Sequence, residues 1–329
     1  MTAMLKVLQA GLYTTIQDMG RWGYQDVGVP VSGALDKTSA QLANVLVGNP
    51  QNTPVLEMLL QGPSLSVQSG SVRVALFGGD GALVVTGARR FTVPAGHSIR
   101  LVQGDEVKVA FLGKSFCSYL AVEGGLNLPL QMGSASTYVR GGIGGLKGRA
   151  LRRGDILRPT LPEADTRAEK LLAALYDYGY AQPIRVVPGP QDDYFTASAK
   201  KAFFTEPYVV TNQVDRMGFR LEGPQLQHSG KHDLVSDGIV SGAIQVPGSG
   251  QPIVLLADAQ TTGGYPKIAT VISSDIPVLA RRRPGSVVRF QPVSLQQAEA
   301  LARDLEARLR AIADHGLKDA APLGKRGWS

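Results

Sequence analysis

The chain has 329 residues, of which 39 are glycine and 20 are proline, and apolar residues make up 43% of it. This apolar content suffices for a sizeable core and excludes disorder as the main state, and the length suggests about two domains. Charged residues account for only 19%, and 34 lysines and arginines against 27 aspartates and glutamates leave a net charge of +7. So mild a basic excess does not indicate nucleic-acid binding, and the frequent glycines and prolines predict short elements joined by tight turns.

The N-terminal segment lacks a basic stretch followed by an apolar run and a cleavage site, and no stretch approaches ~18 uninterrupted apolar residues. The single cysteine, Cys117, lies in the apolar stretch SFCSYLAV and cannot form an internal disulfide. We therefore expect a soluble, cytoplasmic protein without a membrane segment.

The first predicted helix covers residues 36–47, with Asp36 as its N-cap and Gly48 as its terminator. Short runs with period-2 alternation follow between residues 65 and 116, and a second set lies between residues 183 and 292. This alternation is typical of half-buried antiparallel strands.

The two strand sets share short sequence echoes. LLQGPSL at residues 59–65 resembles FRLEGPQL at residues 219–226, and each reads as a strand, a Gly-Pro turn and a strand. We interpret the sets as duplicated halves that differ by loop insertions.

Two further helices are predicted from capping boxes. One covers residues 166–178, opens with T-R-A-E and stops at Gly179, and the other covers residues 294–315, begins with Ser294 and Gln297 and is expected to pack across a barrel. The polar segment after the last helix is expected to fray. The predicted parts are an N-terminal β-barrel domain, a helical linker, a C-terminal β-barrel domain, and a C-terminal helix with tail, at residues 1–165, 166–182, 183–293 and 294–329.

The richest polar cluster follows the most apolar strand of the second set, at residues 255–275. Its glycine pair can adopt positive φ, so amide N–H groups and hydroxyls could point at one anionic oxygen, with Lys267 as the countercharge. The competing interpretation is a hairpin whose side chains satisfy their own turn. The candidates are Asp258, Gln260, Thr261, Thr262, Gly263, Gly264, Tyr265 and Lys267.

A second cluster, at residues 14–44, contains Asp18, Arg21, Asp36 and Asn44 in a glycine-rich setting. The helix that begins near Asp36 would present N–H groups and a positive dipole end to an anion. Alternatively, Asp36 only caps the helix, and Asp18 and Arg21 form a local ion pair.

The glycine-rich basic stretch at residues 138–155 matches neither a Walker nor a dinucleotide-binding pattern, so a basic linker loop is favoured, with Arg140 as a further candidate. His228 and His232 stand four apart around Gly230, without a third ligand nearby. No metal site is therefore expected.

Several stretches resemble a known family: TTIQDMGRWGYQDVGVPVSGALD, ANVLVGN, LEMLLQGP, GQPIVLLADAQTTGGYPKIATVISSD and RPGSVVRF. They are similar to the biotin-dependent carboxyltransferase family, also called the allophanate hydrolase subunit 2 family, from about Val7 to Val293. The resemblance implies a mainly β fold of two tandem cyclophilin-like β-barrel domains with a few short helices.

The resemblance also implies an enzyme, a hydrolase acting on a cyclic amide. A free-standing member of this kind resembles a component of bacterial ATP-dependent 5-oxoprolinase, which converts 5-oxo-L-proline to L-glutamate. The implied partners are the B subunit of that enzyme, which would contact this chain directly, and the A subunit. ATP would be used by the complex and not necessarily bound by this chain. The chain has no biotin-accepting A-M-K-M sequence and no ATP-grasp segment.

On this interpretation the two polar clusters supply the site. The catalytic candidates are Lys267, Asp258, Thr261 and Thr262, and the substrate-binding candidates are Gln260, Gly263, Gly264, Tyr265, Asp18, Arg21, Asp36, Asn44 and Arg140. Two alternatives stay open: a carboxyltransferase component of a urea-carboxylase or allophanate-hydrolase system, and a regulatory antagonist of a kinase inhibitor.

Overall fold

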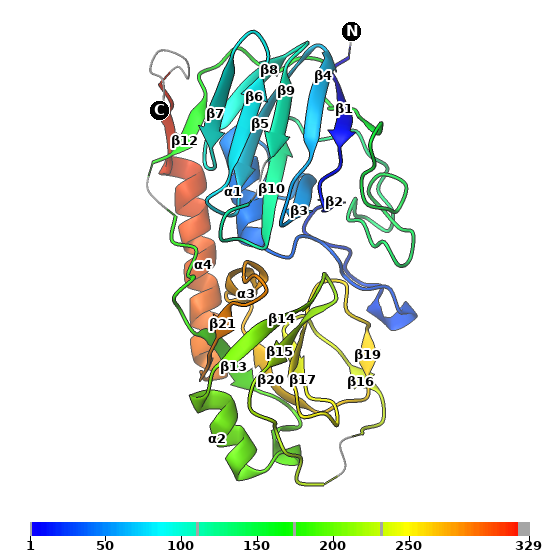
Figure 1. The fold of residues 1–329 in the computed structure, drawn as a ribbon, viewed down its shortest axis with the longest axis vertical. Helices are drawn as coiled ribbons and strands as arrows, with labels where there is room; N and C mark the ends of the chain where they lie inside the picture. The colour runs from blue at the N-terminus through cyan, green and yellow to red at the C-terminus, as the bar shows by residue number, and fades with distance from the viewer. Residues whose placement is uncertain (1, 110–111, 174–175, 231–232, 322–329) are drawn as a thin grey trace. The chain divides into compact units, whose positions relative to one another are not determined.

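The computed structural model describes residues 2–109, 112–173, 176–230 and 233–321. The chain divides into two compact units: unit 1 consists of Met1–Arg21, Ser32–Tyr178 and Arg308–Ser329, and unit 2 of Trp22–Val31 and Gly179–Ala307. Strands predominate over helices in both, as the sequence predicts (Figure 1). The division near residue 178 falls inside the predicted linker. However, unit 1 also takes the C-terminal segment, and unit 2 takes a short N-terminal loop.

Unit 1 contains two antiparallel sheets that enclose one core. The six-stranded sheet has the order β11-β1-β4-β9-β6-β7, and the five-stranded sheet has the order β2-β3-β10-β5-β8. Apolar side chains from both sheets, such as Leu5 and Val74, belong to the same buried cluster. The strands are β1 (Met4–Gln9), β2 (Tyr13–Gln17), β3 (Val55–Leu59), β4 (Ser64–Ser69), β5 (Ser71–Phe77), β6 (Ala82–Thr86), β7 (Arg90–Pro94), β8 (Ser98–Val102), β9 (Glu106–Val109), β10 (Cys117–Val122) and β11 (Ile156–Leu157).

Helix α1 (Lys37–Val47) packs on β5 and β10, so that β5 is buried along its whole length although its sequence alternates. The predicted caps are confirmed. The Asp36 carboxylate accepts from the backbone N–H of Ser39 at 2.9 Å, and Gly48 ends the helix with φ of +80°. Glycine is favoured there because the left-handed conformation costs other residues free energy.

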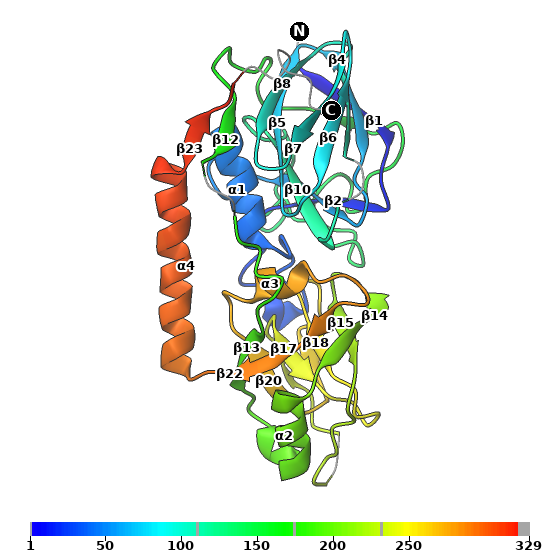
Figure 2. The same cartoon turned by 60° about the vertical axis from the view of Figure 1, so that its left-hand side comes forward.

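The predicted helix at residues 166–178 is wrong. Lys170–Leu172 instead forms strand β12, which pairs with β23 (Leu317–Asp319), as Figure 2 shows. The glutamate of the apparent capping box, Glu169, accepts from Arg73 Nε at 2.9 Å and from the backbone N–H of Arg100 at 2.8 Å. The tail prediction is therefore wrong for residues 317–319, and residues 322–329 lie outside the described part.

Unit 2 is built on one eight-stranded sheet with the order β21-β14-β15-β18-β17-β20-β13-β22. Its two end strands, β21 and β22, are consecutive in the chain and separated only by Arg289, so the sheet is a nearly closed barrel. A small ribbon, β16 with β19, lies beside it (Figure 1). The strands are β13 (Ile184–Pro188), β14 (Tyr208–Val214), β15 (Gly218–Glu222), β16 (Asp237–Gly238), β17 (Ala243–Gln245), β18 (Ile253–Leu255), β19 (Thr262–Gly263), β20 (Lys267–Val271), β21 (Val287–Val288) and β22 (Phe290–Pro292).

Aromatic rings join helix α2 to the barrel, since Phe203 stacks on Phe290 with ring centroids 4.6 Å apart. The other helices are η1 (Gln25–Val27), η2 (Asp192–Tyr194), α2 (Ala197–Thr205), α3 (Ile276–Ala280) and α4 (Leu295–His315). The predicted capping box of α4 is confirmed: Ser294 N–H donates to Gln297 Oε1 at 2.9 Å, and Gln297 N–H donates to Ser294 Oγ at 3.2 Å. That α4 packs across a barrel stays a prediction.

The echo between residues 59–65 and 219–226 does not mark equivalent strand pairs. LLQGPSL leads from β3 through Gly62 and Pro63 into β4, whereas Pro224 after β15 is followed by an irregular segment. The predicted equivalence of these two segments is therefore wrong.

Candidate functional site

Lys267 is the central residue of the polar cluster in unit 2. It begins β20, and its side chain is only 5% exposed. Its Nζ donates to Asp237 Oδ2 at 2.6 Å and to the carbonyl of Gly238 at 3.4 Å, while its backbone N–H donates to Gln191 Oε1 at 3.2 Å. The Asp237 side chain is 54% exposed, and the hydrogen bond from Lys267 lowers the pKa of its carboxyl group.

The ribbon of β16 and β19 connects the glycine pair of the sequence motif, Gly263 and Gly264, to the residues that contact the Lys267 ammonium group. In the pairing of β16 with β19, Asp237 is opposite Gly263 and Gly238 is opposite Thr262. The backbone N–H of Ile239 also donates to the carbonyl of Thr261 at 2.9 Å. Lys267 therefore contacts the strand that pairs with Thr262 and Gly263.

The expected positive φ of the glycine pair is not observed, because neither Gly263 nor Gly264 is in the left-handed region. The two glycines instead allow neighbouring atoms to approach the backbone more closely than a Cβ atom would permit. A Cβ on Gly263 would lie 2.6 Å from the Nε2 of the buried Gln245, and a Cβ on Gly264 would lie 3.0 Å from the carbonyl oxygen of Leu234. The approach of Gln245 in β17 thus accounts for Gly263, and the approach of the Leu234 backbone accounts for Gly264.

Asp258 is bound by an arginine that the sequence did not single out. Arg216 donates from Nε to Asp258 Oδ2 at 2.8 Å and from a terminal nitrogen to Oδ1 at 2.9 Å, and the two side chains are only 3% and 8% exposed. Arg216 lies in the turn between β14 and β15, where a solvated side chain is the ordinary expectation. This bidentate pair fixes the orientation of the Asp258 carboxylate.

The other candidates of this motif differ in exposure. Gln260 and Thr262 are exposed and Thr261 is half-buried. Tyr265 is 40% exposed and lines a cavity of about 230 Å³. The remaining lining residues are Arg220, Leu221, Pro247, Ser249, Gln251, Pro252 and Ile253.

Asp18 holds the polar cluster of unit 1 together. Its buried carboxylate accepts from the Ser134 hydroxyl at 2.7 Å, the Ala135 N–H at 2.7 Å and the Gly20 N–H at 2.8 Å, and also from the Ser136 hydroxyl. The contacts connect the end of β2 to residues more than one hundred positions away. Asp18 therefore orders the loop that follows β10.

Arg21 belongs to the same cluster and is fully buried. Its guanidinium donates to the backbone carbonyls of Gln131 at 3.0 Å and Ser136 at 2.8 Å. A Cβ on Gly144 would collide with the carbonyl oxygen of Ser136 and approach the guanidinium of Arg21. These contacts place the predicted basic loop around Arg21. The local Asp18–Arg21 pair stays a prediction.

The other candidates in unit 1 are not gathered at one point. Asp36 caps α1 and Asn44 lies eight residues further on, about 12 Å along the helix axis. The Asn44 amide donates to the carbonyl of Thr53 at 2.7 Å and accepts from Asn49 at 3.0 Å. Arg140 is exposed at the tip of a short hairpin closed by the Tyr138–Ile143 bridge.

The start of α1 contains polar groups that the sequence analysis missed. The backbone N–H of Asp36 donates to the Tyr119 hydroxyl at 2.7 Å, and this hydroxyl donates to Glu57 Oε2 at 2.8 Å. Burial raises the pKa of Tyr119 well above its usual value. Burial also lowers the pKa of the neighbouring Lys37, against the opposing effect of Asp18. The only signal in the sequence was the position of Lys37 directly after the cap.

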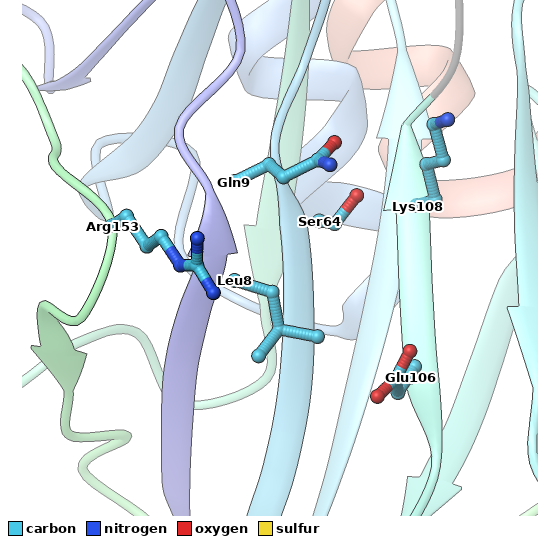
Figure 3. A pocket seen from close by; sticks show the side chains of 6 residues that line it. All are labelled: Leu8, Gln9, Ser64, Glu106, Lys108 and Arg153. Atoms are coloured by element: carbon cyan, nitrogen blue, oxygen red, sulfur yellow. The ribbon is translucent and has the colours of Figure 1, made fainter.

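A larger cavity lies on the six-stranded sheet of unit 1, has a volume of about 560 Å³ and contains none of the predicted site residues (Figure 3). It is lined by Leu8, Gln9, Ser64, Glu106, Lys108 and Arg153. Within the described residues no group of three or more His, Cys, Asp or Glu side chains could hold a metal ion. His232 lies outside them. No helix in the described part is long and apolar enough to cross a membrane.

Comparison with known proteins defines the class. The model of the carboxyltransferase domain, subdomain A and B, matches residues 27–292, and the chain belongs to this family. It is 38% identical to the C subunit of 5-oxoprolinase from Escherichia coli (strain K12), over 94% of this chain and 98% of that protein. It is 36% identical to the C subunit of 5-oxoprolinase from Haemophilus influenzae, over 94% of this chain and 97% of that protein.

Larger proteins share the same fold over part of their length. Urea amidolyase of Saccharomyces cerevisiae is 29% identical over 94% of this chain but only 18% of its own length. The crystal structure of Kluyveromyces lactis urea carboxylase matches with a TM-score of 0.82 at 28% identity, covering 97% of this chain and 30% of that one.

Proposed function

We propose that the chain is the C subunit of an ATP-dependent 5-oxoprolinase, a cytoplasmic hetero-oligomer that converts 5-oxo-L-proline to L-glutamate. The observation that carries this proposal is the 38% identity to the Escherichia coli protein over nearly the full length of both chains. Urea amidolyases also match nearly the whole of this chain, but it spans only about a fifth of their length. The B subunit would be the direct partner, and the A subunit would complete the complex.

The chemistry of this reaction needs groups such as those around Lys267. A five-membered lactam is a poor electrophile, and phosphorylation of its amide oxygen would activate it if the ring carboxylate is held and developing negative charge is stabilised. The Lys267 ammonium, the hydroxyls of Thr261 and Thr262 and the backbone of Gly263 and Gly264 are the groups that would do this. Supporting this role, Lys267 is a buried cation that is paired with an exposed carboxylate, Asp237.

The remaining candidates have supporting roles in this proposal. The Arg216 pair makes Asp258 a positioning residue, and Asp18 and Arg21 order the loop at residues 131–148. Asp36 and Asn44 act through α1 and its connections. ATP would be used by the complex, and any biotin would be carried by another chain.

The test is co-expression with candidate A and B subunits, followed by an assay of ATP-dependent glutamate release from 5-oxoproline. Lys267→Ala should reduce turnover by at least about a hundredfold, the magnitude typical of losing one charge-stabilising group. Lys201→Ala is the matched control, because Lys201 is exposed on α2 in the same unit. No release from an assembled complex would overturn the proposed function, and unchanged turnover in Lys267→Ala would overturn the role of Lys267.

The second candidate is a carboxyltransferase component that takes a carboxyl group from biotin on another chain. The family model and the amidolyase matches favour it. Carboxyl transfer from a separately supplied carboxybiotin carrier, without 5-oxoproline turnover, would support this candidate over the first.

A further inference from the structure

The contact between Lys267 and Asp237 joins a buried charge to an exposed one. The ammonium is withdrawn from solvent, with 5% of the side chain exposed, whereas the aspartate side chain is 54% exposed. In the part of the chain that the structure describes, Asp237 is the one carboxylate within ion-pair distance of Lys267. A buried cation needs a counter-ion, because leaving such a charge unpaired is costly. The exposed partner is the one that can leave at low cost.

We propose that Lys267 is a carboxylate-binding site whose occupant in the free chain is the protein's own Asp237, which a ligand carboxylate replaces. The inference rests on the proposed function for the identity of the natural ligand, but not for the exchange itself. Replacement keeps one negative charge on the ammonium throughout. Opening without a ligand would leave Lys267 buried and unpaired, so exchange is favoured over simple opening.

The segment that carries Asp237 is suited to move. β16 and β19 contain two residues each and form a sheet of their own, outside the eight-stranded barrel. Asp237 and Gly238 are exposed, and the nearby Val235 is 93% exposed. Short strands with few buried contacts open at low free energy.

Opening of the ribbon would release two kinds of group together. The Asp237 carboxylate leaves the Lys267 ammonium, and the backbone of Thr262 and Gly263 loses its partners in β16. One cation and a stretch of backbone donors and acceptors then lie side by side. This set fits a small monocarboxylate that carries an amide close to its carboxyl group, as 5-oxoproline does.

The exchange predicts the sign of a substitution effect. Asp237→Asn keeps the shape of the side chain but removes the internal competitor, so the affinity for acetate should rise about two- to fivefold, as expected for loss of one short, partly exposed ion pair. If the Lys267–Asp237 ion pair only stabilises the ribbon of β16 and β19, Asp237→Asn would weaken acetate binding or leave it unchanged. Either result overturns the proposal.

The measurement is a titration of the full chain with acetate, followed by NMR of lysine labelled with ¹³C at Cε, in which Lys267→Met identifies the Lys267 resonance. Acetamide, the neutral analogue, should shift no resonance in any variant. Glu222→Gln removes an exposed carboxylate from β15 of the same unit and should leave acetate affinity unchanged. An acetate-dependent shift of another lysine resonance that persists with the same affinity in Lys267→Met would place the anion elsewhere and overturn the proposal.

A second readout separates this inference from the proposed function. In the assembled complex, Asp237→Asn should lower KM for 5-oxoproline about two- to fivefold, by the same loss of internal competition. Turnover without this change in KM would overturn the exchange alone. Acetate exchange at Lys267 in a complex that releases no glutamate would overturn the proposed function alone.

Discussion

The Arg216–Asp258 pair allows a sharp test of whether Asp258 reacts with substrate or positions its surroundings. Both side chains are almost fully buried and are joined by two hydrogen bonds of 2.8 and 2.9 Å. Asp258→Leu or Arg216→Met would each remove one half of this bidentate pair and leave the other charge buried. We expect each substitution to destabilise unit 2 by about 3–5 kcal/mol.

The double variant, Arg216→Met with Asp258→Leu, should behave differently. It removes both charges and fills the space with apolar atoms, and such replacements are commonly neutral to within about 1–2 kcal/mol. The expected coupling energy is therefore several kcal/mol. Additive losses would refute the reasoning, because they would show that the two charges do not stabilise one another.

Hydrogen exchange is the suitable assay, because a chain with two units does not unfold in one two-state transition. The backbone N–H groups of Leu256 and Asp258 donate to carbonyls of Met217 and Arg216 and report directly on this region. Glu222→Gln on the exposed face of β15 is the control, with an expected effect within about 0.5 kcal/mol. If the double variant recovers protection but the assembled complex does not recover turnover, Asp258 acts on the substrate.

Two further predictions concern unit 1. Gly144→Ala should lower the melting temperature clearly more than Gly142→Ala. Both glycines have positive φ, of +72° and +64°, but only at Gly144 would the new methyl group collide with the carbonyl oxygen of Ser136. Equal shifts in melting temperature, of the size expected from about 1–2 kcal/mol of φ strain alone, would contradict this prediction. Asp155 accepts two hydrogen bonds of 2.8 Å from Arg149, which lower the pKa of its carboxyl group. Its stabilising effect, about 1 kcal/mol, should be complete above the unfolded pKa of about 3.9 and vanish as pH falls through the lower folded value. Asp155→Asn should thus be less stable than the unsubstituted protein in melts near pH 7, and the difference should shrink as the pH falls below about 4. A pH-independent difference would refute this.

The strands and two of the three long helices could be predicted because their signals are local. The short runs between residues 65 and 116 fall on strands β4 to β9, and the caps of α1 and α4 form as their sequences indicate. The helix predicted from the capping box at residues 166–169 does not form, because the Glu169 carboxylate accepts hydrogen bonds from Arg73 and Ser98. No local sequence pattern reveals these contacts. Tertiary contacts override local propensity in this way at many positions.

The sequence indicated which residues to consider for the candidate site, but not which residues they contact. Lys267 stood out because it lies in a dense polar motif after an apolar strand. Its partner Asp237 lies thirty positions earlier and reaches it only through the pairing of β16 with β19. Arg216 and Lys37 were missed because an arginine in a turn and a lysine after an N-cap ordinarily remain in solvent.

The pairing of β12 with β23 has a consequence for synthesis of the chain. About 145 residues separate Leu172 from Leu317, so at ~5–20 residues per second roughly 7–30 s pass between the emergence of the two strands from the ribosome. During that interval the residues of β13 to β22 are synthesised. Leu171 of β12 forms a bridge with His97, while the other edge of β12 does not yet have its partner strand β23. Unit 1 thus starts to fold before unit 2 exists and finishes after it, which makes the nascent chain vulnerable to wrong strand pairing at this one edge.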